Sequence, residues 1–254
     1  MDVPLRRERI FNVPGVIVAL LFAMVAIHAI REYLLSEQSD IVVLFSFGFV
    51  PARYERSLLI SGTFPGGIGA DFWSFVSYAF LHGDWTHVGV NAAWMLAFGS
   101  PLARRFGSAR TLGFLAVGAI AGALAHLATH GGEQVPMVGA SAAISGAMAG
   151  AMRFVFQPGG PLRRIAGRPA DYHAPAISLR AALLDSRILM FLGVWLGVNA
   201  LFGLGAAPLI GENQSVAWEA HVGGFAAGLL LFGWFDPPPR MPPADTPPME
   251  RIAA

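Results

Sequence analysis

Polar side chains interrupt several segments of this chain that are otherwise apolar. Such groups are costly inside a membrane and therefore indicate a functional site or hydrogen bonds between helices. A serine hydroxyl beside an imidazole can support nucleophilic catalysis, whereas clustered histidines can bind a metal ion. The candidates are His28, His87, Asn91, His126, Ser141, Ser145, Asn199 and His221.

The depth of these groups along their segments shows whether they could form one compact site or a polar path through the bundle. His87 and Asn91 are four residues apart and so share one face of a helix. At 1.5 Å per residue, His87 lies about 5 Å, Asn91 about 10 Å and His221 about 6 Å into its segment. Ser141 lies in the first turn of a third segment. All three segments are expected to begin on the same side, so three helices bring polar groups to a similar shallow depth.

The neighbours of Ser141 and His221 are small. Ser141 lies in the Gly/Ala-rich run 139–146, which leaves the hydroxyl accessible. A helix N-terminus there offers free N–H groups and a positive dipole end that would suit an oxyanion. His221 is followed by Gly224 and Gly228, a small-xxx-small pair typical of close helix packing. The natural partner of that face is the helix that carries Ser141.

Several polar groups have simpler interpretations. A serine within a Gly/Ala-rich helix usually packs or bonds to the preceding turn, which we expect for Ser145. We expect His28 and His126 to be packing or rim residues, and Asn199 to form a hydrogen bond between helices. His82 is expected to organise the entry of the chain into the helix that follows it.

The composition favours a membrane bundle over a soluble domain. Hydrophobic residues make up 55% of the chain and charged residues 13%, against roughly 25% charged in an average soluble domain. The net charge of +1 gives no electrostatic case for nucleic acid as a partner. The absence of cysteine excludes a thiolate metal site and a cysteine nucleophile.

A membrane-spanning helix needs roughly 20 mostly apolar residues. Six segments qualify: 11–34, 84–102, 111–130, 139–156, 188–205 and 217–235. With six spans, all arginines except Arg31, Arg53 and Arg56 fall on one side, and the chain has no lysine. This asymmetry predicts cytoplasmic N- and C-termini. We therefore predict an all-α membrane protein, a six-transmembrane-helix bundle with a long outer-side loop between spans 1 and 2.

The chain divides into three predicted regions. Residues 1–10 form a basic cytoplasmic N-terminus, 11–235 the six-span domain, and 236–254 a Pro-rich cytoplasmic tail predicted to be disordered. The first loop, 32–81, is rich in apolar residues and is expected to lie partly in the outer leaflet. The loop 158–187 is polar and rich in Pro, Gly and Arg, and we expect it to be mobile.

Three motifs give the chain a family resemblance. Residues 80–91, FLHGDWTHVGVN, resemble the second span of rhomboid proteases. Gly139-Ala140-Ser141 with Gly146 resembles their Gly-x-Ser motif, and Ala220-His221-Val222-Gly223-Gly224 with Gly228 resembles their last core span. The motifs occur in the family's order, each in the expected span, and the resemblance covers about residues 11–235.

The resemblance implies an intramembrane serine endopeptidase that cleaves transmembrane-helix substrates near the outer membrane face. It implies that Ser141 is the nucleophile and His221 the general base, a catalytic dyad without a third carboxylate. It assigns the oxyanion hole to His87, Asn91 and the backbone N–H of Ser141. It also implies structural support from His82, Gly139, Gly224 and Gly228.

The implied partners are membrane lipids and transmembrane protein substrates, and the implied location is a multi-pass position in a bacterial inner (plasma) membrane. No cofactor is implied. No metal is expected either, because no His-Glu-x-x-His motif or third ligand accompanies the intramembrane histidines.

Three departures from the family pattern are present. Ala142 follows the serine where the family often has Gly, and Ser145 stands where an aromatic residue commonly packs on the catalytic histidine. Trp73-Ser74 replaces a common Trp-Arg pair. Because Ser145 is not aromatic, His221 must be held by other neighbours or be looser. The alternatives are a non-catalytic rhomboid-like protein that binds membrane helices and, more distantly, a small transporter with polar groups at every membrane depth.

Overall fold

The computed structural model describes residues 13–55, 64–163, 172–201 and 216–238 of the chain. Within these ranges the chain is mostly helical and has no β-strand, apart from an isolated bridge that pairs Phe49 with Met137. The predicted basic N-terminus and all but the first residues of the predicted Pro-rich tail lie outside the described residues.

Helices lie over each of the six predicted segments. Between the first two, the long loop contains short helices of its own, and the described part of the loop 158–187 includes η5 and α8. In chain order the elements are α1 (Gly15–Leu34), α2 (Glu37–Phe47), η1 (Pro51–Tyr54), α3 (Gly67–Ser77), η3 (Tyr78–Phe80), α4 (Trp85–Trp94), η4 (Met95–Gly99), α5 (Ser100–Phe106), α6 (Ser108–Thr129), α7 (Ser141–Val155), η5 (Pro161–Arg163), α8 (Leu179–Ala182), α9 (Ser186–Leu201) and α10 (Trp218–Phe235).

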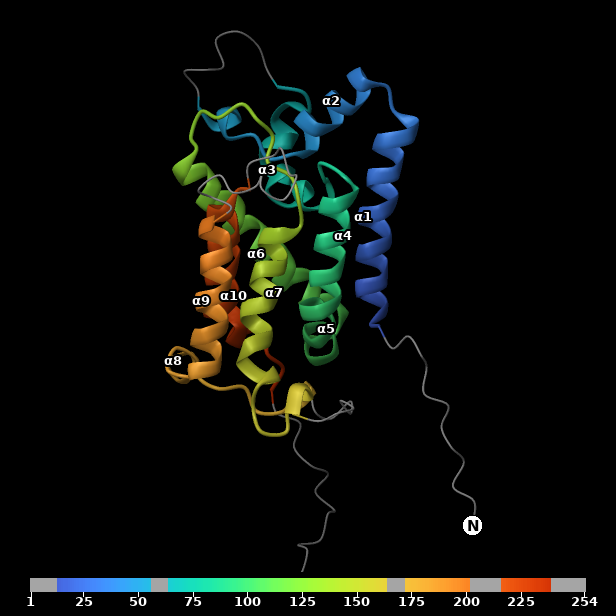
Figure 1. Ribbon diagram of the computed structural model, residues 1–254. Helices are drawn as coiled ribbons and strands as arrows, with labels where there is room; N and C mark the ends of the chain where they lie inside the picture. The colour runs from blue at the N-terminus through green and yellow to red at the C-terminus, as the bar shows by residue number, and fades with distance from the viewer. Residues whose placement is uncertain (1–12, 56–63, 164–171, 202–215, 239–254) are drawn as a thin grey trace, which may run out of the picture.

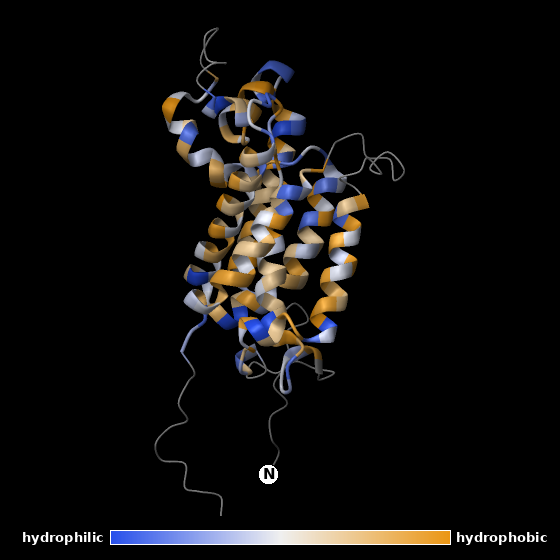
Figure 2. Cartoon of the chain, turned by 90° about the vertical axis from the view of Figure 1, so that its left-hand side faces the viewer, coloured by the Kyte–Doolittle hydropathy of each residue, from blue (hydrophilic) through white to orange (hydrophobic). Residues whose placement is uncertain are grey.

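Two of the described helices, α1 and α6, are long and apolar enough to cross a membrane by length and composition, and α9 is a shorter apolar helix. Each of the other long helical elements has a feature that makes it shorter or less apolar than α1 and α6. A π-helical turn, η4, separates α4 from α5. Helix α7 has 15 residues, and α10 carries Glu219 and His221 in its first turns. Figure 2 shows that the helices are largely hydrophobic along their length and more hydrophilic near both ends of the bundle.

Helix α7 lies at the centre of the bundle and packs against α6 and α10 (Figure 1). Every residue of α7 from Ala142 to Val155 is buried. Helix α9 lies at the periphery, where Ile188 and Asn199 are its buried residues and Trp195 stacks on Phe225 of α10 at 4.6 Å between ring centroids. The centre of the bundle is therefore tightly packed, and its α9 side is more open.

The contact between α7 and α10 depends on small residues. A methyl group at Gly224 would overlap the carbonyl group of Ala142, and one at Gly228 would overlap the carbonyl group of Gly146. The two backbones are thus close enough that no side chain fits between them at these positions. This is the small-xxx-small packing used by helices that associate in lipid.

Buried arginines form ion pairs and hydrogen bonds that join neighbouring elements at each end of the bundle. At the end covered by α2 and α3, Arg31 binds both carboxylate oxygens of Asp40, at 2.6 and 3.0 Å, and donates to the carbonyl oxygen of His82 at 2.7 Å. At the opposite end, Arg105 binds both carboxylate oxygens of Asp236, at 2.5 and 2.9 Å. Because these guanidinium groups are buried and bidentate, they fix loop and helix positions better than exposed ion pairs do.

The packing predicts that Gly224→Ala destabilises the protein. The added methyl group must push α10 away from the Ala142 carbonyl, and overpacking of this kind costs about 1–3 kcal/mol. Thermal unfolding of the purified protein in detergent should show a lower Tm. Gly233→Ala is the matched control in the same helix, because nothing lies within 4 Å of a methyl group there. Equal Tm values for the two variants would contradict the close α7–α10 contact.

Candidate active site

Ser141 and His221 meet across the α7–α10 contact. Ser141 is the first residue of α7, and His221 lies in the first turns of α10. The Nε2 atom of His221 is 2.7 Å from the Oγ atom of Ser141. This is the distance expected of a hydrogen bond between a nucleophile and its general base. Two residues 80 positions apart in sequence are thus brought together by the glycine-lined packing of their helices.

Asn199 of α9 determines which nitrogen of His221 carries the proton. The Oδ1 atom of Asn199 is 2.6 Å from Nδ1 of His221, and its Nδ2 atom donates to the carbonyl oxygen of Trp195 at 2.7 Å. Since a carbonyl only accepts, the amide group must face it with its nitrogen, which leaves Oδ1 to accept from the histidine. Nδ1 of His221 is therefore the protonated nitrogen, and Nε2 has a lone pair directed at the hydroxyl of Ser141.

Gly139 allows a second histidine to approach the serine. Its φ of +120° lies in a region that side-chain-bearing L residues rarely adopt. A Cβ at this position would come within 2.7 Å of Nε2 of His87 and 3.8 Å of Oγ of Ser141. The His87 ring therefore lies against the backbone just before Ser141, where a side chain at residue 139 would exclude it.

The turn before α4 sets the orientation of His87. The side chain of Asp84 caps α4 by accepting from the backbone N–H of His87 at 2.7 Å. The backbone N–H of Gly83 donates to Nδ1 of the His87 ring at 3.4 Å. Because Nδ1 accepts, Nε2 of neutral His87 carries the hydrogen. His87 thus presents an N–H donor on the side of the ring that faces Gly139.

Asn91 is buried one turn further along α4, and its Nδ2 atom donates to the backbone carbonyl of His87 at 3.0 Å. The amide has a second N–H that this bond does not use. The N-terminus of α7 contributes further donors, because the N–H groups of its first turn precede the first intrahelical bond, from Ile144 to the carbonyl of Ala140 at 3.0 Å. The structure brings His87 and the α7 N-terminus to the serine, whereas one donor of Asn91 is directed at the backbone.

His82 lies under the chain entry into α4. It is fully buried, and its ring meets that of His87 edge to face at 4.9 Å between centroids. Burial lowers the pKa of His82 to about 3, so the ring is neutral at physiological pH. Its backbone carbonyl accepts the hydrogen bond from Arg31, which ties the turn before α4 to the end of α1.

The remaining polar candidates lie apart from the serine and differ in their surroundings. His28 is buried on α1, with its ring edge-on to Trp85 at 4.7 Å. Ser145 is buried in α7, one turn after Ser141. His126, expected to be a packing or rim residue, instead bonds through Nδ1 to the carboxylate of Glu219 at 2.7 Å. Glu219 is buried and is not among the candidates that the sequence pattern indicates.

Asn199 is the other residue whose importance the sequence only partly indicated. An amide within an apolar helix predicts a hydrogen bond between helices, and the bond exists. Its partner, the second nitrogen of His221, could not be read from spacing along the chain. This bond supplies a neighbour that holds His221 in a protein where Ser145 stands in place of an aromatic residue.

Comparison with known families places most of the chain in a described domain family. A family model described as the Rhomboid domain matches residues 69–236, more than half of the chain. The matched range begins within α3, ends directly after α10 and includes the candidate site residues named above. No curated protein sequence is similar enough to count as a match.

The bond from Asn199 predicts the effect of its removal. Asn199→Ala leaves Nδ1 of His221 without its acceptor, so the imidazole is held less firmly in the orientation and tautomer that face Ser141. If Ser141 acts as a nucleophile with His221 as its base, misplacement of the base is costly, and we expect a fall in kcat of about 10–100-fold with little change in KM. Steady-state cleavage of a model transmembrane substrate measures this. Val198→Ala, at an exposed position of the same helix, should keep wild-type rates, and wild-type kcat in Asn199→Ala would contradict the role.

Proposed function

This chain belongs to the rhomboid family of integral membrane proteins, and on that premise we propose that it is a serine endopeptidase that cleaves transmembrane helices within the membrane. The family supplies the membrane location, and the polar cluster around Ser141 supplies the chemistry. The proposed reaction is hydrolysis of a peptide bond through an acyl-enzyme.

The supporting observation is the 2.7 Å hydrogen bond between Ser141 and His221. Asn199 sets the tautomer in which Nε2 is the base. A serine that merely packs in a Gly/Ala-rich helix would bond to the carbonyl of the preceding turn. Ser141 has no preceding turn, because it begins α7. Its hydroxyl is instead bonded to an imidazole that can accept the proton.

In the proposed mechanism, Nε2 of His221 takes the proton from Oγ of Ser141 as the oxygen attacks the substrate carbonyl. The bond from Nδ1–H to Asn199 keeps the imidazolium in place while it holds this proton. The same nitrogen then gives the proton to the leaving amine. Water, activated by His221, resolves the acyl-enzyme and restores the serine.

The oxyanion of the tetrahedral intermediate needs fixed donors. We propose that the Nε2–H of His87, the backbone N–H of Ser141 and the second N–H of Asn91 serve this role. His87 and Ser141 lie at the N-terminus of α7, where the helix dipole also favours negative charge. Each preorganised donor of this kind contributes about 3–4 kcal/mol to transition-state stabilisation.

We propose that α1, α4 with α5, α6, α7, α9 and α10 each cross the membrane, which gives six spans. The arginine asymmetry then puts both termini in the cytoplasm and the serine at a shallow depth near the outer face. Water reaches a site at that depth more readily than one at the midplane. The corresponding location is the inner (plasma) membrane of a bacterium.

The proposed substrates follow from the depth of the site. A transmembrane helix hides its carbonyl groups in its own hydrogen bonds, so it must unwind locally before Ser141 can attack. Segments with small or helix-breaking residues near the outer face unwind at least cost. The alternative, a rhomboid-like protein that binds such helices without cutting them, would use the same bundle but need neither the serine nor the base.

Replacement of the serine separates these two functions. Ser141→Ala should abolish cleavage of a model transmembrane substrate and labelling by a fluorophosphonate probe, because it removes the hydroxyl that is bonded to His221. The control Ser145→Ala changes a buried serine one turn away and should keep both signals. Labelling that persists in Ser141→Ala, or a wild-type protein that neither cleaves nor labels while correctly folded, would overturn the proposed activity.

The oxyanion donors generate a separate prediction. His87→Ala and Asn91→Ala should each lower kcat by about 10²–10³-fold, since each removes one donor to the transition state. Both variants should still react with the probe at Ser141, although more slowly. Unchanged turnover in either variant would reject that residue as a donor, and single-turnover kinetics would show whether the chemical step is the one affected.

A further inference from the structure

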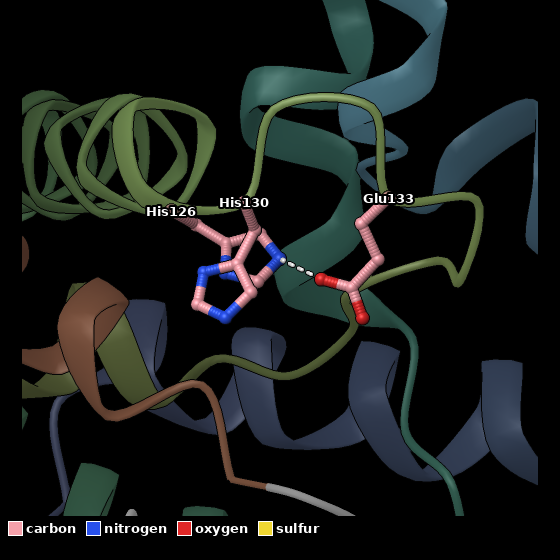
Figure 3. Close-up of side chains that lie close together, drawn as sticks. All are labelled: His126, His130 and Glu133. Atoms are coloured by element: carbon pink, nitrogen blue, oxygen red, sulfur yellow. Dashed lines mark ion pairs between the residues drawn. The ribbon is translucent and has the colours of Figure 1, made fainter.

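A second cluster of ionisable side chains lies at the end of α6, separate from the serine. His126 and His130 are four residues apart and therefore share one face of the helix end. Their rings stack at 4.6 Å between centroids. Glu133 follows in the loop after α6, and its carboxylate lies beside the two rings (Figure 3). One nitrogen or oxygen atom from each residue lies within 4.8 Å of the other two.

Glu219, from the first turn of α10, is hydrogen-bonded to the ring of His126 and lies beside that of His130. Its Oε1 atom is 2.7 Å from Nδ1 of His126 and 3.1 Å from Nδ1 of His130. A carboxylate accepts, so Nδ1 of His126 carries a hydrogen. Nδ1 of His130 is 2.9 Å from Oγ1 of Thr129, whose hydroxyl donates to the backbone carbonyls of Ala125 and His126 and so accepts from the ring. In the neutral rings both Nε2 atoms therefore keep their lone pairs. Metal-binding histidines are commonly held in this way, with the nitrogen remote from the metal donating to a carboxylate.

A bound cation would stabilise the two carboxylates in this cluster. Glu219 is 6% exposed, and a buried carboxylate is costly unless positive charge compensates it. The Oε2 atom of Glu133 is also shielded from solvent and has no hydrogen-bond partner, since Nε2 of His126 is 3.7 Å away. A divalent ion between the Nε2 atoms and Glu133 would balance both carboxylates and give this oxygen its partner.

We propose that His126, His130 and Glu133 bind a divalent transition-metal ion of the zinc class, with Glu219 as the positioning carboxylate. Two imidazoles and one carboxylate form a donor set suited to zinc, whose ligands lie at about 2.0–2.2 Å. Tetrahedral ligands at that distance are roughly 3.4 Å apart. The 3.7 Å between His126 and Glu133 is already close to this. Rotation of the side chains of His130 and Glu133, both on the rim, would complete the geometry.

The site would connect three elements that meet near the serine. His126 and His130 belong to α6, Glu133 to the loop that leads to α7, and Glu219 to α10, two residues before His221. A bound ion would hold His126 in the tautomer that donates to Glu219. The metal would thereby fasten the first turn of α10 to the end of α6, and we expect the Tm of the protein to rise with metal concentration.

Direct binding measurements test the proposal. Full-length Ser141→Ala protein in detergent, freed of metal by chelation, is titrated with Zn²⁺ by calorimetry and with Co²⁺ by visible absorption. We expect one ion per chain, a tetrahedral Co²⁺ spectrum and a higher Tm with Zn²⁺. His130→Ala and Glu133→Gln, both at partly exposed positions, should each weaken binding at least 10-fold, and Glu219→Gln by about 10–100-fold.

His173→Ala is the matched control, because it removes a histidine outside the cluster and should bind Zn²⁺ as the parent does. His130→Gln serves as a second variant if His130→Ala does not fold, which the metal-free Tm reveals. A parent protein that binds no Zn²⁺ at micromolar concentration would show that the cluster is only a set of ion pairs. Equal binding by the parent and by both ligand variants would equally overturn the site. Because every measurement is of binding to protein without Ser141, the result is independent of the proposed protease activity.

Discussion

The close approach of α7 and α10 is the contact on which the candidate site depends. Gly224 and Gly228 let the α10 backbone meet the carbonyl groups of Ala142 and Gly146. Ser141 and His221 lie at one end of this same interface, so their 2.7 Å bond is a consequence of backbone packing rather than of flexible side chains. In a membrane, where apolar surface gives little drive for association, such shape fit between helices is a main source of stability.

Each polar group of the site acts as a donor or as an acceptor because a neighbouring group can only accept or only donate a hydrogen bond. The Trp195 carbonyl turns the amide of Asn199 so that its oxygen meets His221. The Gly83 N–H makes Nδ1 of His87 an acceptor. As a result His221 presents a lone pair and His87 presents an N–H. The same type of side chain is thus an acceptor at one position and a donor at the other. The apolar surroundings matter because they leave few competing partners.

The sequence predicted the parts of this arrangement that depend on local pattern. The apolar runs located the helices, and the shallow depth of Ser141, His87 and His221 predicted that they share one end of the bundle. Such patterns do not predict which side chains on different helices pair with one another. Asn199 and Glu219 are 22 and 93 residues from the histidines they bind, and their pairing depends on the rotation of each helix about its axis. A shift of one residue along either helix would turn the side chain away from its partner.

The first turn of α10 ties the two polar clusters together. Glu219 and His221 are two residues apart, and on a helix this spacing turns them toward different neighbours. Glu219 meets the histidines of α6, while His221 meets α7 and α9. Any displacement of this turn changes both sets of bonds together. The buried carboxylate therefore restrains the position of the proposed general base without touching it.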